Sequence, residues 1–272
     1  YRFSDKARAA AATALAEAYK CVVLAAKEGI GGMTMAHAAE LLGSILKPLT
    51  DQCNKEDSLQ AADAILDALR EILTLERTHS VGAFNGSAAL QGTIQLIKRH
   101  LQLDEARMKS RAAEAAEREE EEEEDDEEDE EAEGELLSTC AHLVVELLKQ
   151  HGLAAVAPIE AQLLPHVQPW LMGGETTRLA LGLETLGAII EYSGKEHGKK
   201  YVTAALPLLG QHSGSEEPRL RRAALYGLGV VAEHGGKLLS RNAAADLGKK
   251  LQATLEEPTA SYSANVEASE AA

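Results

Sequence analysis

Two glycine-containing apolar segments near the carboxyl end repeat each other at a fixed interval, and this interval constrains the fold more than any other feature. Both segments, at about 175–194 and 216–235, have the periodicity of a helix. Five residues recur 42 positions later: Leu186, Gly187, Glu191, Gly194 and Lys195 recur as Leu228, Gly229, Glu233, Gly236 and Lys237. A period of about 40 residues with two helices per unit is typical of helical solenoids. In such an array each unit packs only on its neighbours.

The second copy carries clear signals for the start and end of a helix. Proline at 218, preceded by two acids, suits a first helical turn, and the glycines at 235 and 236 suit its end. Ala224, Leu225, Leu228 and Val231 fall on one apolar face. Gly227 and Gly229 are expected to allow close approach of a neighbouring helix.

The rest of the chain also reads as helices, because alanine and leucine dominate and aromatic residues make up only 3%. Helices are predicted in pairs: about 34–52 with 56–75, 87–115 with 135–151, 155–172 with 175–193, 196–211 with 216–234, and 241–256 with 261 onward. The segment 155–172 is expected to be broken by Pro158, Pro165 and Pro169. A first helix, about 8–27, is the second half of a repeat whose partner is missing. The prediction is an all-α superhelix, a HEAT-repeat solenoid with right-handed stacking of antiparallel helix pairs.

An acidic run interrupts this array. Residues 119–131 are thirteen consecutive acids, and residues 117–135 carry fifteen of the seventeen net negative charges. Repulsion between acids four residues apart weakens a helix there, and no apolar residue is available to offset the ordering entropy. We therefore predict repeats over 1–115, a disordered acidic insertion over 116–134, and repeats over 135–272, with structure resuming at Leu136 and the last repeat truncated.

The acidic run has three interpretations: a solvating spacer, a binding site for basic partners, or a competitor that lies along the protein's own surface. Because the run lies between two helices of one repeat and not at a terminus, a functional role is weighed equally with a plain solvated spacer. The candidate partner-binding residues are Glu121, Glu122, Glu123, Glu124, Asp125, Asp126, Glu127, Glu128, Asp129 and Glu130.

The sequence argues against catalysis and against bound cofactors or metals. It contains no nucleophile-elbow, phosphate-loop, zinc-protease or EF-hand motif. Cys21, Cys53 and Cys140 are isolated, without a histidine at ligand spacing, and are expected to be reduced thiols. No basic stripe for nucleic acid is present, and no signal peptide or apolar run of membrane length is identified, so neither direct nucleic-acid binding nor membrane insertion is expected.

Three arginines recur about three residues into a helix, each after an acid: Arg8, Arg178 and Arg221. We expect an inter-repeat ladder, in which each arginine pairs with an acid or a carbonyl group of its neighbour, in preference to contacts with a partner protein. Asn265 is assigned to the same structural set. Trp170 is expected to pack at a helix end.

The helix over 218–236 also resembles a particular family. Its residues PRLRRAALYGLGVVAEHGG are similar to the P-x-V-R-Q-A-A-x-Y-G-x-G-V-x-A-x-x-G-G helix of the importin-beta superfamily, in the subgroup called importin-5 or karyopherin-beta-3. Residues 265–271, NVEASEA, are similar to the N-V-N-A-T-E-N of that subgroup, although Glu267 and Ser269 depart from it. The acidic insertion followed by Leu163, Leu164 and Pro165 matches the order of the family's segments.

This resemblance implies a function without catalysis. The family consists of nuclear transport receptors that bind cargo proteins with basic signals, pass Phe-Gly nucleoporins and release cargo on binding Ran-GTP. The resemblance is to the C-terminal third, so the main Ran-binding repeats would lie outside this chain. It also implies a location in the cytoplasm and nucleus and at the nuclear pore. A HEAT-repeat scaffold subunit of a phosphatase or another assembly is the alternative.

Overall fold

The computed structural model describes residues 4–82, 87–117, 124–173 and 175–235, with a few isolated positions after 244. For residues 87, 114–117, 124–129, 195 and 196 only the backbone is described. Within these ranges the regular elements are all helices, which confirms the all-α prediction. The chain divides into two compact units at Thr185 and Leu186, and each is described by itself.

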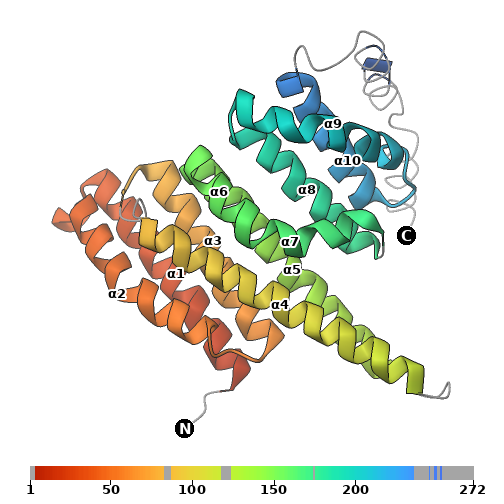
Figure 1. The fold of residues 1–272 in the computed structure, drawn as a ribbon. Helices are drawn as coiled ribbons and strands as arrows, with labels where there is room; N and C mark the ends of the chain where they lie inside the picture. Colours follow the sequence, from red (N-terminus) through yellow and green to blue (C-terminus); the bar gives the residue numbers. More distant parts are fainter. Residues whose placement is uncertain are drawn as a thin grey trace, which may run out of the picture. The chain divides into compact units, whose positions relative to one another are not determined.

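The first unit begins with five long helices (Figure 1). They are α1 (Asp5–Glu28), α2 (Met35–Cys53), α3 (Leu59–His79), α4 (Ser87–Glu117) and α5 (Glu124–His151), and a short 3-10 helix, η1 (Ile30–Gly32), follows α1. The predicted helices over 8–27, 34–52, 56–75 and 87–115 are confirmed, although α3 begins three residues later and ends four residues later than predicted. Serine caps start α1 and α3, because the side chains of Ser4 and Ser58 accept hydrogen bonds from the backbone N–H groups of Ala7 and Ala61.

These helices form two layers that alternate along the chain. In one layer α3 packs between α1 and α5, and in the other α2 and α4 are neighbours. The α3 helix is buried on both flanks: Ala61, Ala62, Ile65, Leu66, Ala68, Leu69, Ile72, Leu73 and Glu76 are all inaccessible to solvent. An apolar stripe this wide shows that α3 is an interior member of a stack.

The proline-rich segment after α5 is divided at Pro165 and Pro169 as predicted, but it is not broken at Pro158. It comprises α6 (Leu153–Gln162), the single turn α7 (Leu164–Val167) and the 3-10 helix η2 (Gln168–Met172). Pro165 and Pro169 lie in the first turns of α7 and η2, where the missing N–H group is tolerated, whereas Pro158 lies inside α6. Trp170 is buried, and Gly182 of α8 (Thr176–Tyr192) faces it without a side chain.

The second unit contains the end of α8, α9 (Lys195–His212) and α10 (Pro218–Gly235), and α9 packs against α10. The expected close approach at Gly227 is confirmed, because a Cβ atom there would lie 2.5 Å from Leu209 Cδ2. The same expectation for Gly229 is wrong, since a Cβ atom there would meet no described atom within 4 Å. The helices predicted over 241–256 and 261–272 lie outside the described residues.

The structure corrects the prediction for the acidic run. The α5 helix begins at Glu124, so residues 124–134 are helical and the expected restart at Leu136 is wrong; residues 118–123 lie outside the described ranges. Two physical effects favour this helix. Acids near a helix N-terminus are stabilised by the helix dipole. The second effect is pairing with basic residues of α4, described below.

A second correction concerns α1. By length and composition this helix could cross a membrane, contrary to the expectation that the chain has no such apolar run. Helices in the folded core of a protein meet the same criterion. In this structure α1 packs against α2 and α3 and buries Ala12, Ala16, Tyr19 and Val23.

Two glycine-to-alanine substitutions test the close packing of the second unit. A Cβ atom at Gly198 would lie 2.7 Å from the carbonyl oxygen of Ile190. Because a helix backbone cannot move aside cheaply, Gly198→Ala should lower the free energy of unfolding by about 1–3 kcal/mol. Gly229→Ala is the matched control and should raise it by about 0.5–1 kcal/mol, since the space is open and alanine favours helix. Urea unfolding measures both, and equal effects would contradict the packing.

Candidate protein-interaction surface

The acidic residues predicted to bind partners are only partly described. Glu121, Glu122 and Glu123 lie outside the described residues. Residues 124–129 form the first turns of α5, with their side chains not described. Glu130 is exposed on α5, and one of its carboxylate oxygens lies 3.5 Å from Arg111 Nη1 of α4. This last acid of the candidate set therefore faces the protein's own arginine.

Glu133, one turn further along α5, is the centre of a buried charge cluster. Its side chain is only 2% exposed, and Oε1 lies 2.7 Å from Arg107 Nε and within ion-pair distance of Arg111 Nη2. Arg107 and Arg111 lie four residues apart and so on one face of α4. Two positive charges thus lie against the carboxylate of Glu133 where α5 packs on α4. The predicted insertion included Glu133, so this role was not foreseen from the sequence.

Arg178 of α8 completes this cluster. Nη2 of Arg178 lies 2.7 Å from Oδ1 of Asp104 in α4, and Nε donates to Oδ2 of the same carboxylate at 3.4 Å. Arg178 also pairs with Glu175 one turn before it and lies 3.9 Å from Glu133 Oε2. Burial disfavours the charge of Arg178, but the hydrogen bond to Asp104 and the surrounding carboxylates raise its pKa above the ordinary value.

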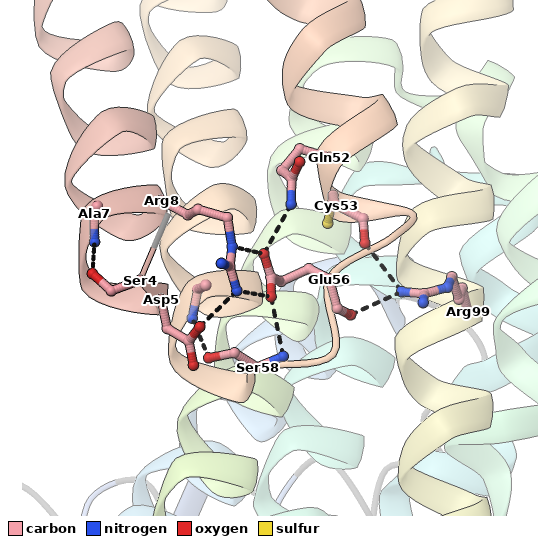
Figure 2. A network of polar contacts seen from close by, with 10 residues as sticks. Ser4, Asp5, Ala7, Arg8, Gln52, Cys53, Glu56, Ser58 and Arg99 are labelled. Carbon is pink, nitrogen blue, oxygen red and sulfur yellow. Dashed lines mark hydrogen bonds and ion pairs between the residues drawn. The ribbon is translucent and has the colours of Figure 1, made fainter. Parts of the chain in front are cut away.

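Arg8 of α1 makes a comparable arrangement in the turn between α2 and α3 (Figure 2). Its Nε and Nη2 donate to the two carboxylate oxygens of Glu56 at 2.7 and 2.8 Å, and Nη2 also donates to Asp5 at 2.7 Å. Glu56 is buried, and it accepts further hydrogen bonds from Gln52 Nε2 and from the backbone N–H of Ser58. The hydrogen bond from Arg8 is the main reason that the pKa of Glu56 falls from 4.5 to about 2.

The same turn is also held from the α4 side. Arg99 Nη1 donates to the backbone carbonyl oxygens of Cys53 and Glu56, at 3.0 and 3.4 Å (Figure 2). Arg8 and Arg99 therefore fix one turn from two helices, α1 and α4. The arrangement stabilises the repeat junction and leaves little of Glu56 for a partner.

The other members of the expected ladder behave differently. Arg221 of α10 donates through Nη1 to the carbonyl oxygen of Ser215, at 2.9 Å, in the turn before its own helix. Asn265 lies outside the described residues. Arg8 and Arg178 thus share one design, an acid three residues earlier and a buried acid from another element, whereas Arg221 has a carbonyl partner close in sequence. A ladder through all four positions stays a prediction.

The described histidine, cysteine and acidic side chains are the groups that a metal site would need. No group of three or more histidine, cysteine, aspartate or glutamate residues could hold a metal ion in the described part of the chain. The structure does bring His100 Nε2 within 3.3 Å of Cys53 Sγ, a pair that sequence spacing did not reveal. Burial raises the pKa of Cys53 to about 12 and lowers that of His100 to about 4, so a reactive thiolate is disfavoured.

Replacing the carboxylate of Glu56 tests its role at the repeat junction. Glu56→Gln should lower the free energy of unfolding at pH 7 by about 2 kcal/mol, because a buried partner of Arg8 loses its charge. A lowered folded-state pKa contributes stability above pH 4.5 that is lost as the pH falls through about 2. The difference in the free energy of unfolding between wild type and Glu56→Gln should therefore become smaller as the pH falls from 4.5 to about 2. Urea unfolding at several pH values measures it, with exposed Glu40→Gln as control; a gap independent of pH would contradict the assignment.

The cluster around Glu133 predicts a local effect on the start of α5. Glu133→Gln leaves Arg107 and Arg111 without their shared carboxylate, so the acidic turns of α5 should open more often. Hydrogen exchange of the backbone amides of 124–132 should accelerate about tenfold. Glu130→Gln, at an exposed pair, should change exchange much less. Equal protection in wild type and Glu133→Gln would show that the cluster does not hold this helix.

Comparisons with known proteins agree with this architecture. Residues 83–172 match the family described as importin repeat 6. No curated protein sequence matches the chain. The crystal structure of the karyopherin Kap121p bound to the SUMO protease Ulp1p aligns with a TM-score of 0.67 and 19% identity, over 94% of this chain and 21% of that chain. A crystal structure of Kap121p alone gives a TM-score of 0.65 and 18% identity, over 91% and 20%.

The chain spans about a fifth of the length of these karyopherin structures. At such low identity the structural match shows the fold, and the family match covers α4 to η2, including the acidic start of α5. Residues 83–172 are thus similar to an importin repeat, and the chain as a whole has the HEAT-repeat fold of the karyopherin structures.

Proposed function

We propose that the chain is part of a nuclear transport receptor of the importin-5 type, which carries cargo proteins between cytoplasm and nucleus. The receptor binds cargo with basic signals, passes Phe-Gly nucleoporins and is controlled by Ran-GTP, mainly through repeats outside this chain. The observation that supports this most directly is the importin repeat at residues 83–172, set in a stack of paired helices. The function is binding, without a catalytic step.

The arrangement of charge supports binding through surface side chains. The carboxylates of Glu56, Asp104 and Glu133 are buried and paired with arginines of the same chain, so they are committed to the fold. The thiols of Cys53 and Cys140 are buried as well. The eleven consecutive acids at 119–129, which precede Glu130, are the densest concentration of charge in the sequence.

We assign the binding of basic cargo segments to Glu121–Asp129. A lysine- or arginine-rich segment would be attracted to consecutive carboxylates, and the attraction would be screened by salt. Among the structural relatives, Kap121p was crystallised bound to the protein Ulp1p. For this chain we propose both that it binds cargo and that residues 121–129 form the binding site.

The transport role is tested with the longest natural polypeptide that contains the chain. Immobilised polypeptide should retain Ran loaded with a non-hydrolysable GTP analogue, and it should also retain a Phe-Gly repeat fragment. A HEAT-repeat scaffold of a phosphatase or another assembly should retain neither. If the polypeptide retained neither Ran nor the Phe-Gly fragment, the transport assignment would be overturned. The fold assignment would not be affected.

The acidic segment generates a separate prediction. Changing every acid of 121–129 to its amide should weaken binding of a lysine-rich peptide at least tenfold at low salt, and it should flatten the salt dependence of the affinity. Fluorescence anisotropy of a labelled peptide at several salt concentrations measures both.

The matched control neutralises exposed acids elsewhere, at Glu28, Glu40, Asp51 and Asp57. This variant removes charge without touching the acidic segment, and it should keep the wild-type affinity and salt slope. If the 121–129 variant also kept them, the segment would be a spacer.

A further inference from the structure

The last turn of α3 is followed by an exposed serine. Ser80 comes directly after His79, the final residue of α3, and has a φ of 53°, the only positive φ of a non-glycine residue in the described part of the chain. The backbone N–H groups of Ser80 and Val81 both donate to the carbonyl oxygen of Glu76. The chain thus leaves the helix at Ser80 and exposes this residue to solvent.

The sequence around Ser80 has the pattern that basophilic protein kinases recognise. Arg77 lies three residues before Ser80, Leu75 lies five residues before it and Phe84 lies four residues after it. The acidic substrate cleft of such a kinase pairs with the arginine, and apolar pockets on either side select the two apolar residues. Four matching positions are a more specific signal than an arginine and a serine alone.

The structure leaves this segment accessible. Arg77 and Ser80 are exposed, and Leu75 and His79 are half-buried. A kinase binds its substrate in an extended conformation, so the last turn of α3 has to open before the transfer. Opening costs little, because no residue of α3 after Glu76 belongs to the buried core.

Arg77 is held by an acid of α5, and that acid has a second basic partner. Nε and Nη2 of Arg77 lie 3.3 Å from Oε2 of Glu146. The other carboxylate oxygen of Glu146 lies 2.8 Å from Nζ of Lys149. Arg77 can therefore leave Glu146 without producing an uncompensated buried charge, because Lys149 still neutralises the carboxylate.

We propose that Ser80 is a phosphorylation site for a basophilic serine/threonine kinase, and that the attached phosphate takes Arg77 away from Glu146. In the transfer, the hydroxyl oxygen of Ser80 forms a bond to the γ-phosphorus of ATP, and the bond from that phosphorus to the oxygen that bridges to the β-phosphate breaks. ADP leaves with this oxygen, and the hydroxyl proton passes to the catalytic aspartate of the kinase. The inference is independent of cargo or Ran binding.

The phosphate acts on the contact between α3 and α5. It carries a charge of about −1.5 to −2 at pH 7 and three acceptor oxygens, which favour a guanidinium three residues away. The carboxyl end of α3 is the negative pole of the helix dipole, so the added charge destabilises the last turn unless Arg77 neutralises it. Phosphorylation thus removes the ion pair of Arg77 with Glu146, which links α3 to α5 at this point.

Phosphorylation is tested on the folded chain with ATP, Mg²⁺ and the purified catalytic domain of a kinase that requires arginine three residues before its target. Tandem mass spectrometry should locate the phosphate on Ser80. Arg77→Ala should slow its incorporation at least tenfold, whereas Arg222→Ala, at an exposed arginine of α10, is the matched control and should not change the rate. A synthetic peptide of residues 73–86 tests the motif alone. A peptide that is phosphorylated while the folded chain is not would overturn the proposal, and so would a failure of both.

A substitution of Glu146 tests whether the phosphate captures Arg77. Glu146→Gln should lower the melting temperature of the unphosphorylated chain, because Arg77 loses its carboxylate partner. In the chain phosphorylated at Ser80 the same substitution should lower it by less than half as much, since Arg77 has already moved to the phosphate. Glu71→Gln, which weakens the pair of α3 with α1, is the matched control and should have equal effects in both forms. Equal effects of Glu146→Gln in the two forms would exclude the transfer of Arg77.

Discussion

The packing of α3 between α1 and α5 is the constraint on which the first unit depends. A helix buried on both flanks cannot be stable alone, because its apolar surface needs two neighbours. The ion pair of Lys20 with Glu71 is partly exposed and contributes little energy, whereas in the pair of Arg77 with Glu146 the carboxylate is buried. Their value is positional, since each fixes the register of one helix against the next while the apolar contacts supply the stabilisation.

Buried arginine–carboxylate pairs act where one repeat meets another. Each such pair carries a desolvation cost, which the geometry must offset. At Glu56 the offset comes from two nitrogens of Arg8, the amide of Gln52 and a backbone N–H. At Asp104 it comes from the two-nitrogen contact with Arg178. Each of these pairs connects a helix of one repeat to a turn or helix of another. Apolar contacts alone would not align the two elements so specifically.

The helix positions were largely predictable from local signals, such as the serine caps, the apolar periodicity and the prolines at 165 and 169. The start of α5 was not, because repulsion among its acids argued against a helix and the neutralising residues, Arg107 and Arg111, lie on another helix. Their spacing of four was the available signal. The proximity of Cys53 and His100 was likewise hidden, since residues 47 apart meet only through the stacking of α2 and α4.

The pairing of α5 acids with arginines of other helices also bears on the role of the acidic run. Glu133 is enclosed by α4 and α8, and Glu130 faces Arg111, so the end of the run serves the fold. The backbone of α5 is held at this end by the buried cluster, and under the proposed function a partner that attracts the earlier acids would not have to break that cluster. Under the proposed function, binding and folding could be changed separately, because different carboxylates would carry them.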